Sequence, residues 1–391
     1  MDGKDMTIGF DAKRIVRNST GLGSYGRTLI GDLARHESLS LRLYAPDAGR
    51  DDLRRQVPSS ADVVFCYPSP SWLPYYRQWW RRRGVVGDLV RDGVQLYHGL
   101  SGELPVGLRR HGLRSVVTIH DLIFLRHPEF YHWLDTQIYA AKFRQAVREA
   151  DHIIAISECT KRDIIELGAV DEQRISVIYQ SYAPRFKMMD NEMQAASTTD
   201  NAAGITASQL PFRLPRRYVL SVGSIERRKN TMLALKALHY LPEEVSLVLV
   251  GHHTPYADEL TEYAAAHDLG QRLLVLHGVS DDQLPAVYAG AETFVYPSVY
   301  EGFGIPIIEA VGCGLPVVAC TGSCLEEAGG PDALYVRPDD VEGMANAIRQ
   351  TLRGADGRQQ RIERSRRYIR RFEGRDVAAQ VIDLYRRLLQ P

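Results

Sequence analysis

The feature that most constrains the fold is an alternation of short apolar runs with longer amphipathic stretches, which occurs twice along the chain. Residues 40–46, 114–122, 152–157 and 174–180 are apolar runs of strand length. The alternation restarts at 216–224 and continues through 245–253, 272–279, 291–298 and 316–322. Alternating strand and helix patterns are typical of parallel sheets covered by helices. The sequence therefore predicts an α/β protein with two doubly wound, Rossmann-like domains.

The length of 391 residues also favours two domains, because it exceeds the size of one usual core. We predict a first domain over 1–185, a linker or insertion over 186–212 where the periodicity is lost, and a second domain over 213–367. Residues 368–391 belong to an arginine-rich tail that predicts exposed helices, and we expect the last helix to pack back on the first domain. Ligands are expected in a cleft facing the carboxyl ends of both sheets.

Charge and composition exclude several classes of function. Lys and Arg balance Asp and Glu at 48 each, so nothing global indicates a nucleic-acid partner. The first residues lack the pattern of a signal peptide and no window resembles a membrane span, so we expect a cytoplasmic protein. The five cysteines form no CxxC pair, and no Asp-x-Asp motif occurs, so metal-free chemistry is favoured.

Two glutamates eight residues apart, Glu301 and Glu309, flank a glycine-rich turn between a predicted strand and a predicted helix. Gly302 and Gly304 permit close approach by a ligand, and Pro306 suits the first turn of a helix. Free N–H groups at a helix start favour an anion such as phosphate. Because carboxylates would repel that anion, we expect them to accept hydrogen bonds from neighbouring hydroxyl groups. A plain turn with a solvated glutamate remains an alternative.

A basic turn, Arg227-Arg228-Lys229, follows another predicted strand and precedes a helix that begins near Thr231. Cations at the exit of a strand can reach the same cleft, and each charge-assisted hydrogen bond contributes about 1.5–3 kcal/mol. We therefore expect a departing nucleoside diphosphate to depend on Arg228 and Lys229. The alternative is a solvated basic turn.

A third stretch matches the dinucleotide fingerprint G-x-G-x-x-G through Gly21, Gly23 and Gly26, and by spacing alone it suggests an NAD-binding dehydrogenase. The predicted strand at 7–11 ends well before Gly21, whereas the fingerprint follows its strand almost directly. A glycine loop that opens a helix toward the cleft fits equally well.

Two further stretches contain candidate ligand-binding groups. His120 and Asp121 close a predicted strand, where a histidine can hydrogen-bond a substrate hydroxyl, although most lone histidines are structural. With His127 it still lacks the third ligand of a metal site. The aromatic and basic run 72–84 could touch a membrane surface, but an amphipathic helix packed on the first domain is the favoured interpretation.

Together these motifs resemble glycosyltransferase family 4, retaining enzymes with the two-domain GT-B fold, over nearly the whole chain. The most specific part is 301–309, which is similar to the family's E-x7-E motif. The resemblance implies that Glu301 contacts the hydroxyls of the donor sugar and that Glu309 contacts the nucleotide ribose. It also implies a glycine turn and backbone N–H groups near the diphosphate, at Gly302, Phe303, Gly304 and Ile305.

Other positions match the family less specifically. Lys229 matches the lysine that binds the donor diphosphate, Ser224 stands where an arginine is usual, and Arg228 is then the second cation. His120 resembles a histidine near the transferred sugar, and Gly23 resembles a loop glycine beside the phosphate. The remaining implied contacts are Val279 and Leu284 with the nucleobase, and Leu22, Ser101, Glu103 and Asp121 with the acceptor.

The resulting hypothesis is retaining, metal-independent transfer of a hexosyl unit from a nucleotide sugar to a saccharide or lipid-linked acceptor, with no cofactor. GDP-mannose is the expected donor, because 120–131 and 225–230 resemble bacterial mannosyl- and rhamnosyltransferases of surface-polysaccharide assembly. Glu301, His120, Lys229 and Arg228 are the expected catalytic residues. Peripheral contact with the cytoplasmic membrane face stays open. The alternatives are a GT-B-fold sugar-nucleotide epimerase and a non-catalytic sugar-nucleotide-binding partner.

Overall fold

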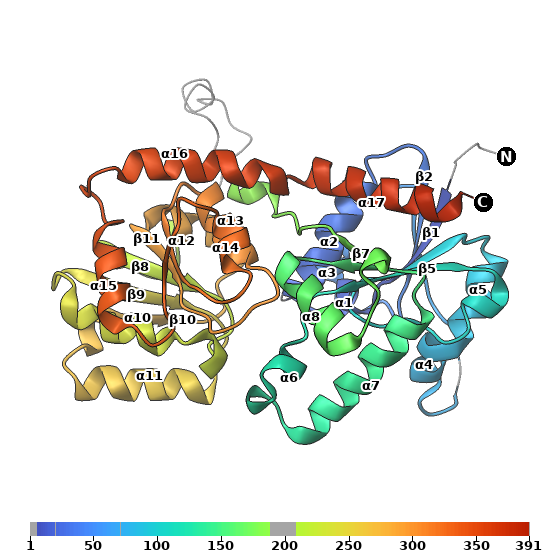
Figure 1. Cartoon of the computed structure of the whole chain (residues 1–391), viewed down its shortest axis with the longest axis horizontal. Helices are drawn as coiled ribbons and strands as arrows, with labels where there is room; N and C mark the ends of the chain where they lie inside the picture. Colours follow the sequence, from blue (N-terminus) through green and yellow to red (C-terminus); the bar gives the residue numbers. More distant parts are fainter. Residues whose placement is uncertain (1–5, 20, 71, 188–208, 391) are drawn as a thin grey trace. The chain divides into compact units, whose positions relative to one another are not determined.

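The computed structural model describes residues 6–19, 21–70, 72–187 and 209–390 (Figure 1). The chain divides into two compact units: unit 1 combines Met1–Ser181 with Phe372–Pro391, and unit 2 is Tyr182–Arg371. Most of the predicted linker, 188–208, lies outside the described residues. Each unit contains one parallel sheet, so the α/β prediction is confirmed.

The sheet of unit 1 has seven parallel strands in the order β3-β2-β1-β4-β5-β6-β7. The order reverses at β1, where Phe10 pairs with Leu43 on one side and with His98 on the other. Helices cover both faces of this sheet, which explains why its strands are near-continuous apolar runs. The strands are β1 (Met6–Asp11), β2 (Leu39–Tyr44), β3 (Val63–Cys66), β4 (Leu96–Gly99), β5 (Arg114–Ile119), β6 (His152–Ala155) and β7 (Ile175–Val177).

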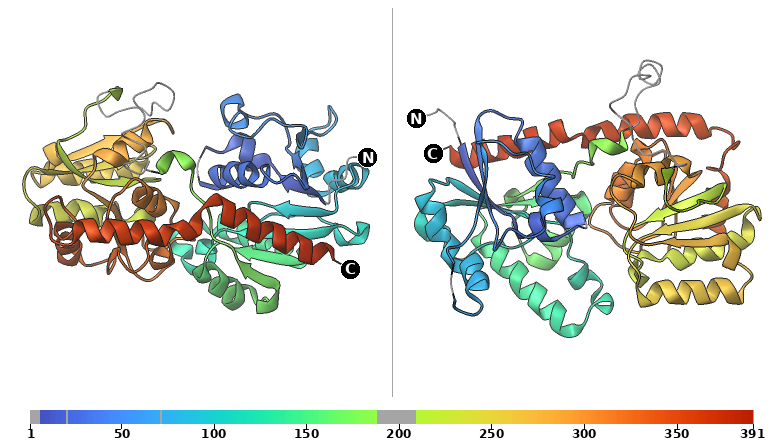
Figure 2. Two further views of the ribbon diagram at one scale, coloured as in Figure 1. Left: turned by 90° about the horizontal axis from the view of Figure 1, so that it is seen from above. Right: turned by 180° about the vertical axis from the view of Figure 1, so that it is seen from behind.

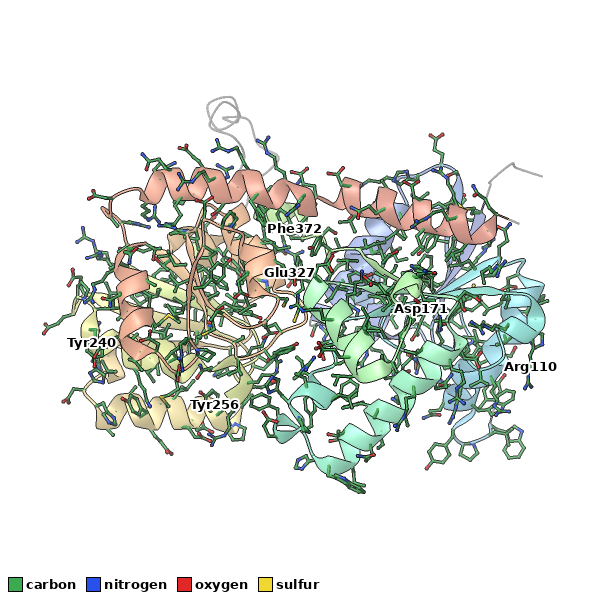
Figure 3. The ribbon with its side chains drawn as sticks, viewed as in Figure 1. Arg110, Asp171, Tyr240, Tyr256, Glu327 and Phe372 are labelled. Atoms are coloured by element: carbon green, nitrogen blue, oxygen red, sulfur yellow. The ribbon has the colours of Figure 1, made fainter. Side chains whose placement is uncertain are left out.

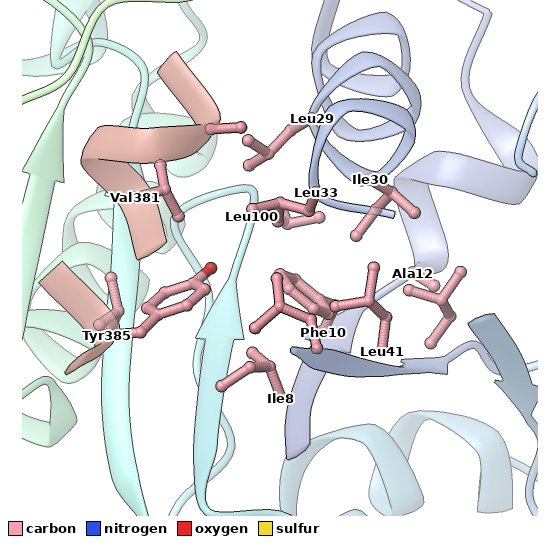
Figure 4. Close-up of a cluster of buried hydrophobic side chains, with 14 of the residues drawn as sticks. Ile8, Phe10, Ala12, Leu29, Ile30, Leu33, Leu41, Leu100, Val381 and Tyr385 are labelled. Atoms are coloured by element: carbon pink, nitrogen blue, oxygen red, sulfur yellow. The ribbon is translucent and has the colours of Figure 1, made fainter. Parts of the chain in front are cut away.

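The C-terminal helix α17 (Gly374–Leu389) packs on one face of this sheet together with α2 (Gly21–Leu33). Figure 4 shows Val381 and Tyr385 of α17 in the same apolar cluster as Phe10 and Leu33. The last helix thus packs on unit 1, as expected from the sequence, and it is not simply an exposed helix, because apolar residues at helical spacing give it a buried face. The other helices of unit 1 are α1 (Lys13–Arg17), α3 (Asp51–Arg54), α4 (Tyr76–Trp79), α5 (Val85–Arg91), α6 (Ile123–Arg126), α7 (Trp133–Glu149) and α8 (Glu158–Gly168).

A buried polar network joins α17 to the centre of the sheet. His98 of β4 has its Nδ1 2.6 Å from the hydroxyl of Tyr385 and its Nε2 2.8 Å from Oγ1 of Thr118. The hydroxyl of Tyr25 lies 3.2 Å from the same Thr118 oxygen. Burial, followed by the charge of His120, lowers the pKa of His98 to about 3, so its ring is neutral. Each ring nitrogen has a partner, as a buried imidazole requires.

The sheet of unit 2 has six parallel strands in the order β10-β9-β8-β11-β12-β13, and this order reverses between β8 and β11. Helices α10, α11 and α15 share an apolar core with β8 and β9, and α11 is the yellow helix along one side of this sheet (Figure 2). The strands are β8 (Arg217–Val222), β9 (Val245–Val250), β10 (Leu273–Leu276), β11 (Thr293–Tyr296), β12 (Val317–Cys320) and β13 (Leu334–Val336). The helices are α10 (Thr231–Ala237), α11 (Pro255–Ala266), α12 (Leu284–Gly290), α13 (Ile305–Gly312), α14 (Leu325–Gly329), α15 (Val341–Arg349) and α16 (Arg358–Ile369).

Removing the Tyr385 hydroxyl tests how strongly the polar network holds α17. Tyr385→Phe leaves Nδ1 of the buried His98 without its partner, and an unpaired buried polar atom costs about 1–3 kcal/mol. We expect a lower melting temperature by calorimetry, whereas Asp383→Asn on the exposed face of the same helix should leave it nearly unchanged. Equal melting temperatures for Tyr385→Phe and wild type would contradict this role.

Candidate functional site

The candidate site of unit 2 lies where its strand order reverses, the usual place for a ligand in an open α/β sheet. Two loops meet there. A short 3-10 turn, Arg227–Lys229, follows β8, and the loop 297–304 follows β11. The backbone N–H of Val299 donates to the carbonyl oxygen of Arg228 at 2.9 Å, so the two loops are hydrogen-bonded to each other.

An ion cluster formed by Arg228, Lys229 and Glu301 occupies this position. Nζ of Lys229 lies 2.5 Å and Nη1 of Arg228 2.9 Å from Oε1 of Glu301. The three side chains are only 11–15% exposed. Arg228 also donates to the carbonyl oxygen of Tyr300, and Lys229 donates to the hydroxyl of Tyr296. Within these three buried side chains two cations share one carboxylate, a net charge of about +1, and the more exposed Glu226 lies 3.8 Å from Nη2 of Arg228 at the edge of the cluster.

The charges of the cluster support one another. Burial by itself would raise the pKa of Glu301, but the neighbouring Lys229 and Arg228 lower that pKa below its usual value. Burial would likewise lower the pKa of Lys229, but the charge of Glu301 raises that pKa above its usual value. Glu301 and Lys229 are therefore both ionised at neutral pH.

The start of α13 lies directly after Glu301 in the chain. Gly304, with φ +135°, precedes the helix, and Pro306 is in its first turn. A Cβ atom at Gly304 would be strained by this φ and would lie 3.2 Å from Cβ of Ala328. The buried Cys324 thiol contacts the carbonyl oxygens of Glu301 and Phe303 at 3.1 Å and 2.7 Å. Sequence reasoning counted Cys324 only among five cysteines without a CxxC pair and missed its contact with the loop.

Glu309 lies further along α13 and has a different environment. Its Oε2 accepts a hydrogen bond from the hydroxyl of Tyr288 on α12 at 3.2 Å. Burial raises the pKa of Glu309 to about 8, so the carboxyl group is mostly protonated at neutral pH. The repulsion between two carboxylates and an anion, which the sequence suggested, is therefore absent, since Glu301 is paired and Glu309 is mostly neutral.

The other predicted donor residues of unit 2 lie around these groups. Ser224 follows β8 and lines a small pocket together with Lys229 and Tyr296. Leu284 begins α12, one helical turn before Tyr288, and therefore lies on the Glu309 side of the site. Val279 lies in the segment between β10 and α12 and is partly buried. Their roles toward a nucleotide stay predictions.

Unit 1 contains a separate cavity of about 290 Å³ at the carboxyl ends of β4 and β5. It is lined by five residues that the sequence associated with the acceptor or with the transferred sugar: Leu22, Ser101, Glu103, His120 and Asp121. The cavity wall also includes residues that sequence reasoning missed, among them Arg14, Phe124, Tyr131, Tyr139 and Lys142. Tyr139 and Lys142 belong to α7, and no motif in that helix pointed to a ligand.

Gly23 has a structural reason to lack a side chain. A Cβ atom at Gly23 would lie 1.8 Å from the carbonyl oxygen of Asn18, and one at Gly26 would lie 2.8 Å from Cγ1 of Ile15. Both glycines therefore let α2 approach α1 and the turn that follows it. A role for Gly23 beside a phosphate stays a prediction.

The Glu103 carboxylate is fully engaged by cations. It accepts from Arg81 at 2.7 Å and from Lys142 at 2.9 Å, and Arg81 also pairs with Asp11 at 2.8 Å. Burial would raise the pKa of Glu103, but Arg81 and Lys142 lower it to about 2. Glu103 thus links α7 to the π-helical turn Trp80–Gly84 at one wall of the cavity.

The ring of His120 already has two protein partners. Nε2 lies 2.8 Å from the carbonyl oxygen of Leu100, which can only accept, so Nε2 carries the proton. Nδ1 then accepts from the side-chain amide of Gln180 at 2.8 Å. Burial lowers the pKa of His120 to about 4. The hydrogen bond to the carbonyl of Leu100 acts in the opposite direction, and the charge of Arg14 lowers the pKa further. A substrate hydroxyl can bond the ring only by replacing one of these partners.

Comparisons with known proteins match both units. A model described as Glycosyltransferase Family 4 matches residues 20–182, and one described as Glycosyl transferases group 1 matches 206–368. O-antigen chain mannosyltransferase B of Escherichia coli is 30% identical, and the alignment covers 98% of this chain and 100% of that relative. The chain belongs to glycosyltransferase family 4. The family resemblance is confirmed, and the protein is a glycosyltransferase.

Two further comparisons extend this result. The transferase is 35% identical to an MMP alpha-(1→4)-mannosyltransferase of Mycolicibacterium hassiacum, with 79% of this chain and 72% of that relative covered. Its structure is similar to HepE of Anabaena in complex with UDP-glucose, with a TM-score of 0.71, 17% identity, and 98% and 100% of the two chains covered. The two parallel α/β units are those of the GT-B fold, as predicted.

The described part of the transferase offers no group of three His, Cys, Asp or Glu side chains arranged to hold a metal ion. Among the same residues, no helix is long and apolar enough to span a bilayer.

The raised pKa of Glu309 predicts a specific pH dependence of stability. Folded Glu309 keeps its proton up to about pH 8, whereas its ordinary value is 4.5, so the stability of wild type should fall as pH rises between these values. Glu309→Gln cannot ionise. The melting temperature of the variant minus that of wild type should therefore increase as pH rises from 5 to 8. Scanning fluorimetry measures this difference.

The matched control is Glu342→Gln, at an exposed position of α15. Its melting-temperature difference from wild type should stay flat over the same pH range. A flat difference for Glu309→Gln as well would show that the Glu309 carboxyl group titrates normally.

Proposed function

We propose that the transferase moves a hexosyl unit from a nucleotide sugar to a saccharide acceptor, with the donor bound by unit 2. The observation that supports this most is the ion cluster, which brings a net positive charge to the reversal point of the sheet beside the start of α13. Cationic side chains and a helix N-terminus together suit a diphosphate. HepE, which shares the fold, was solved in complex with UDP-glucose.

Each group of the cluster then has a distinct role. Lys229 and Arg228 hold the diphosphate, with the backbone N–H groups of 303–305 at the start of α13. When the phosphate oxygens replace Glu301 as the partners of Lys229 and Arg228, the carboxylate can accept hydrogen bonds from the sugar hydroxyls. Glu309 and Tyr288 bond the ribose on the other side of the helix start.

The reaction follows from these roles. The bond between the anomeric carbon and the diphosphate oxygen breaks, and an acceptor oxygen forms the new bond to that carbon on the same face. The acceptor proton goes to the departing diphosphate, so configuration is retained without a nucleophile from the protein. Lys229 and Arg228 stabilise the negative charge that develops on the leaving group, a role that needs neither a metal ion nor a cofactor.

The names of the relatives support mannose as the transferred sugar. Both relatives described above are mannosyltransferases, and one acts on the O-antigen chain. GDP-mannose is therefore our proposed donor, and a growing saccharide, free or lipid-linked, is the proposed acceptor in the cytoplasm. The cavity of unit 1 supports this assignment, since carboxylate, amine and aromatic side chains line it together. Such groups can bond and cover a sugar ring.

Glu301→Gln tests the proposed role of the carboxylate. The neutral amide accepts more weakly from sugar hydroxyls and removes the carboxylate that Arg228 and Lys229 share, so transfer from GDP-mannose should fall by about 10²–10³-fold. The measurement is the formation of mannosylated acceptor, with GDP release followed in parallel. Because the ion cluster is also structural, the melting temperature should fall as well.

Glu259→Gln is the matched control, because Glu259 pairs only at the surface with Arg227 of the same basic turn. It should retain nearly full transfer. Wild-type transfer by Glu301→Gln would contradict the proposed site. Conversion of the donor with no acceptor present would instead indicate the sugar-nucleotide epimerase.

A further inference from the structure

Three of the four tryptophans are exposed. The exposed fractions are 90% for Trp72, 55% for Trp79 and 71% for Trp133, whereas Trp80 is 2% exposed. Tryptophan is highly buried on average in folded proteins, so three open indole rings in one unit require an explanation.

These tryptophans belong to two segments of unit 1, the first over 72–79 and the second over 133–134. Both segments also expose other large apolar side chains. The first segment adds Leu73 at 50% and Tyr75 at 79%, and the second adds Leu134 at 65%. We call the six residues the aromatic surface: Trp72, Leu73, Tyr75, Trp79, Trp133 and Leu134.

Both segments lie on the same layer of unit 1. Trp80, next to the first segment, and Phe143 of α7 belong to one apolar core on one face of the sheet. Glu103 bridges Arg81 of the π-helical turn and Lys142 of α7. Within unit 1, α4 and α7 lie on the side away from α17 (Figures 1 and 2). The two segments can therefore meet a single large partner.

The backbone of the first segment is shaped to expose its rings. Tyr75 has φ +62°, a left-handed conformation that costs a tyrosine of the order of 1–2 kcal/mol. The short helix α4 then passes into the π-helical turn Trp80–Gly84, and such π-helical turns are frequent at functional sites. Both the strained backbone and the exposure of apolar rings to water lower the stability of the free protein. We therefore expect this segment to have a function other than stability.

The charges within and next to the first segment are all positive, whereas Asp135 directly follows Leu134 in the second segment. Residues 63–87 contain four arginines and no Asp, Glu or Lys, in a chain whose formal net charge is zero. Arg77 pairs with Asp47, and Arg81 pairs with Asp11 and Glu103. Arg82 and Arg83 are exposed. The two exposed arginines next to the first segment therefore favour a negatively charged partner that also accepts amphipathic rings.

We propose that the aromatic surface binds peripherally to an anionic lipid membrane. Tryptophan and tyrosine place an apolar ring among acyl chains and keep a polar edge at the headgroups, and exposed arginines attract anionic lipids. Tyr139 and Lys142 of the neighbouring helix turns line the cavity of unit 1, so binding would also bring that cavity to the membrane. This last consequence rests on the proposed transfer function, but membrane binding itself does not.

Vesicle binding by the wild-type protein tests the proposal without donor or acceptor. We expect co-sedimentation with vesicles of phosphatidylglycerol and phosphatidylcholine, weaker binding to pure phosphatidylcholine, and weaker binding as salt increases. Brominated lipids should quench most of the tryptophan emission, because only Trp80 is buried.

Two variants separate the apolar and charged contributions. Trp72→Ser with Tyr75→Ser should lower the vesicle partition coefficient at least about tenfold, since two large side chains no longer enter the interface. Arg82→Glu with Arg83→Glu should lower it by about fivefold or more for each arginine, on anionic vesicles. Tyr240→Ser is the control, because Tyr240 is 46% exposed and belongs to unit 2 (Figure 3). It should bind like wild type.

Three outcomes would overturn the proposal. One is the absence of vesicle binding by wild type, and another is equal binding to neutral and anionic vesicles that none of the variants changes. The third is a dimer in sedimentation analysis that Trp72→Ser with Tyr75→Ser dissociates, without vesicle binding, which would assign the surface to a second copy of this chain. Since none of these measurements involves transfer, their failure leaves the proposed function untouched.

Discussion

The buried ion cluster of Arg228, Lys229 and Glu301 is the interaction on which the candidate site depends. It joins the loops that follow β8 and β11, the two strands between which the sheet order reverses. Removing one member of a buried ion pair leaves the other charge buried without a counter-ion, which destabilises the folded protein by about 3–5 kcal/mol. The cluster therefore fixes the positions of both loops and of the residues at the start of α13. Because its three buried side chains include two cations and one carboxylate, the cluster can also attract an anion. A neutral apolar contact between the two loops could not do so.

Unit 1 organises its polar groups differently. Its cavity is bounded by a carboxylate that two cations neutralise, Glu103, and by a histidine whose two ring nitrogens have protein partners, His120. Behind the cavity, His98 links β4 to Tyr385 of the C-terminal helix. Unit 1 is thus held by neutral hydrogen bonds in its core and by paired charges at its cavity. This difference is what our proposal requires, since the proposed donor side binds a diphosphate and the proposed acceptor side binds hydroxyl groups.

Much of the fold could be predicted from the sequence, because alternating apolar runs depend only on neighbouring residues. The same holds for the turn and helix of 301–309, where Gly304 and Pro306 mark the start of α13. The pairing of Lys229 with Glu301 could not be predicted, since it joins residues 72 positions apart. The contacts of Cys324 and the raised pKa of Glu309 likewise follow only from three-dimensional packing. The cavity residues of α7 were missed because their spacing is that of any amphipathic helix.

The most direct test of the central claim measures how much the diphosphate contributes to binding. Calorimetry would compare GDP and UDP with their nucleosides, for wild type, Lys229→Met and, as a control on the same turn, Arg227→Met, whose side chain is 71% exposed. The quantity to compare is the difference in binding free energy between the tighter-binding nucleoside diphosphate and its nucleoside. If the ion cluster binds the diphosphate, this difference should fall by about 1.5–3 kcal/mol in Lys229→Met and stay nearly constant in Arg227→Met. An unchanged difference in Lys229→Met would contradict the account.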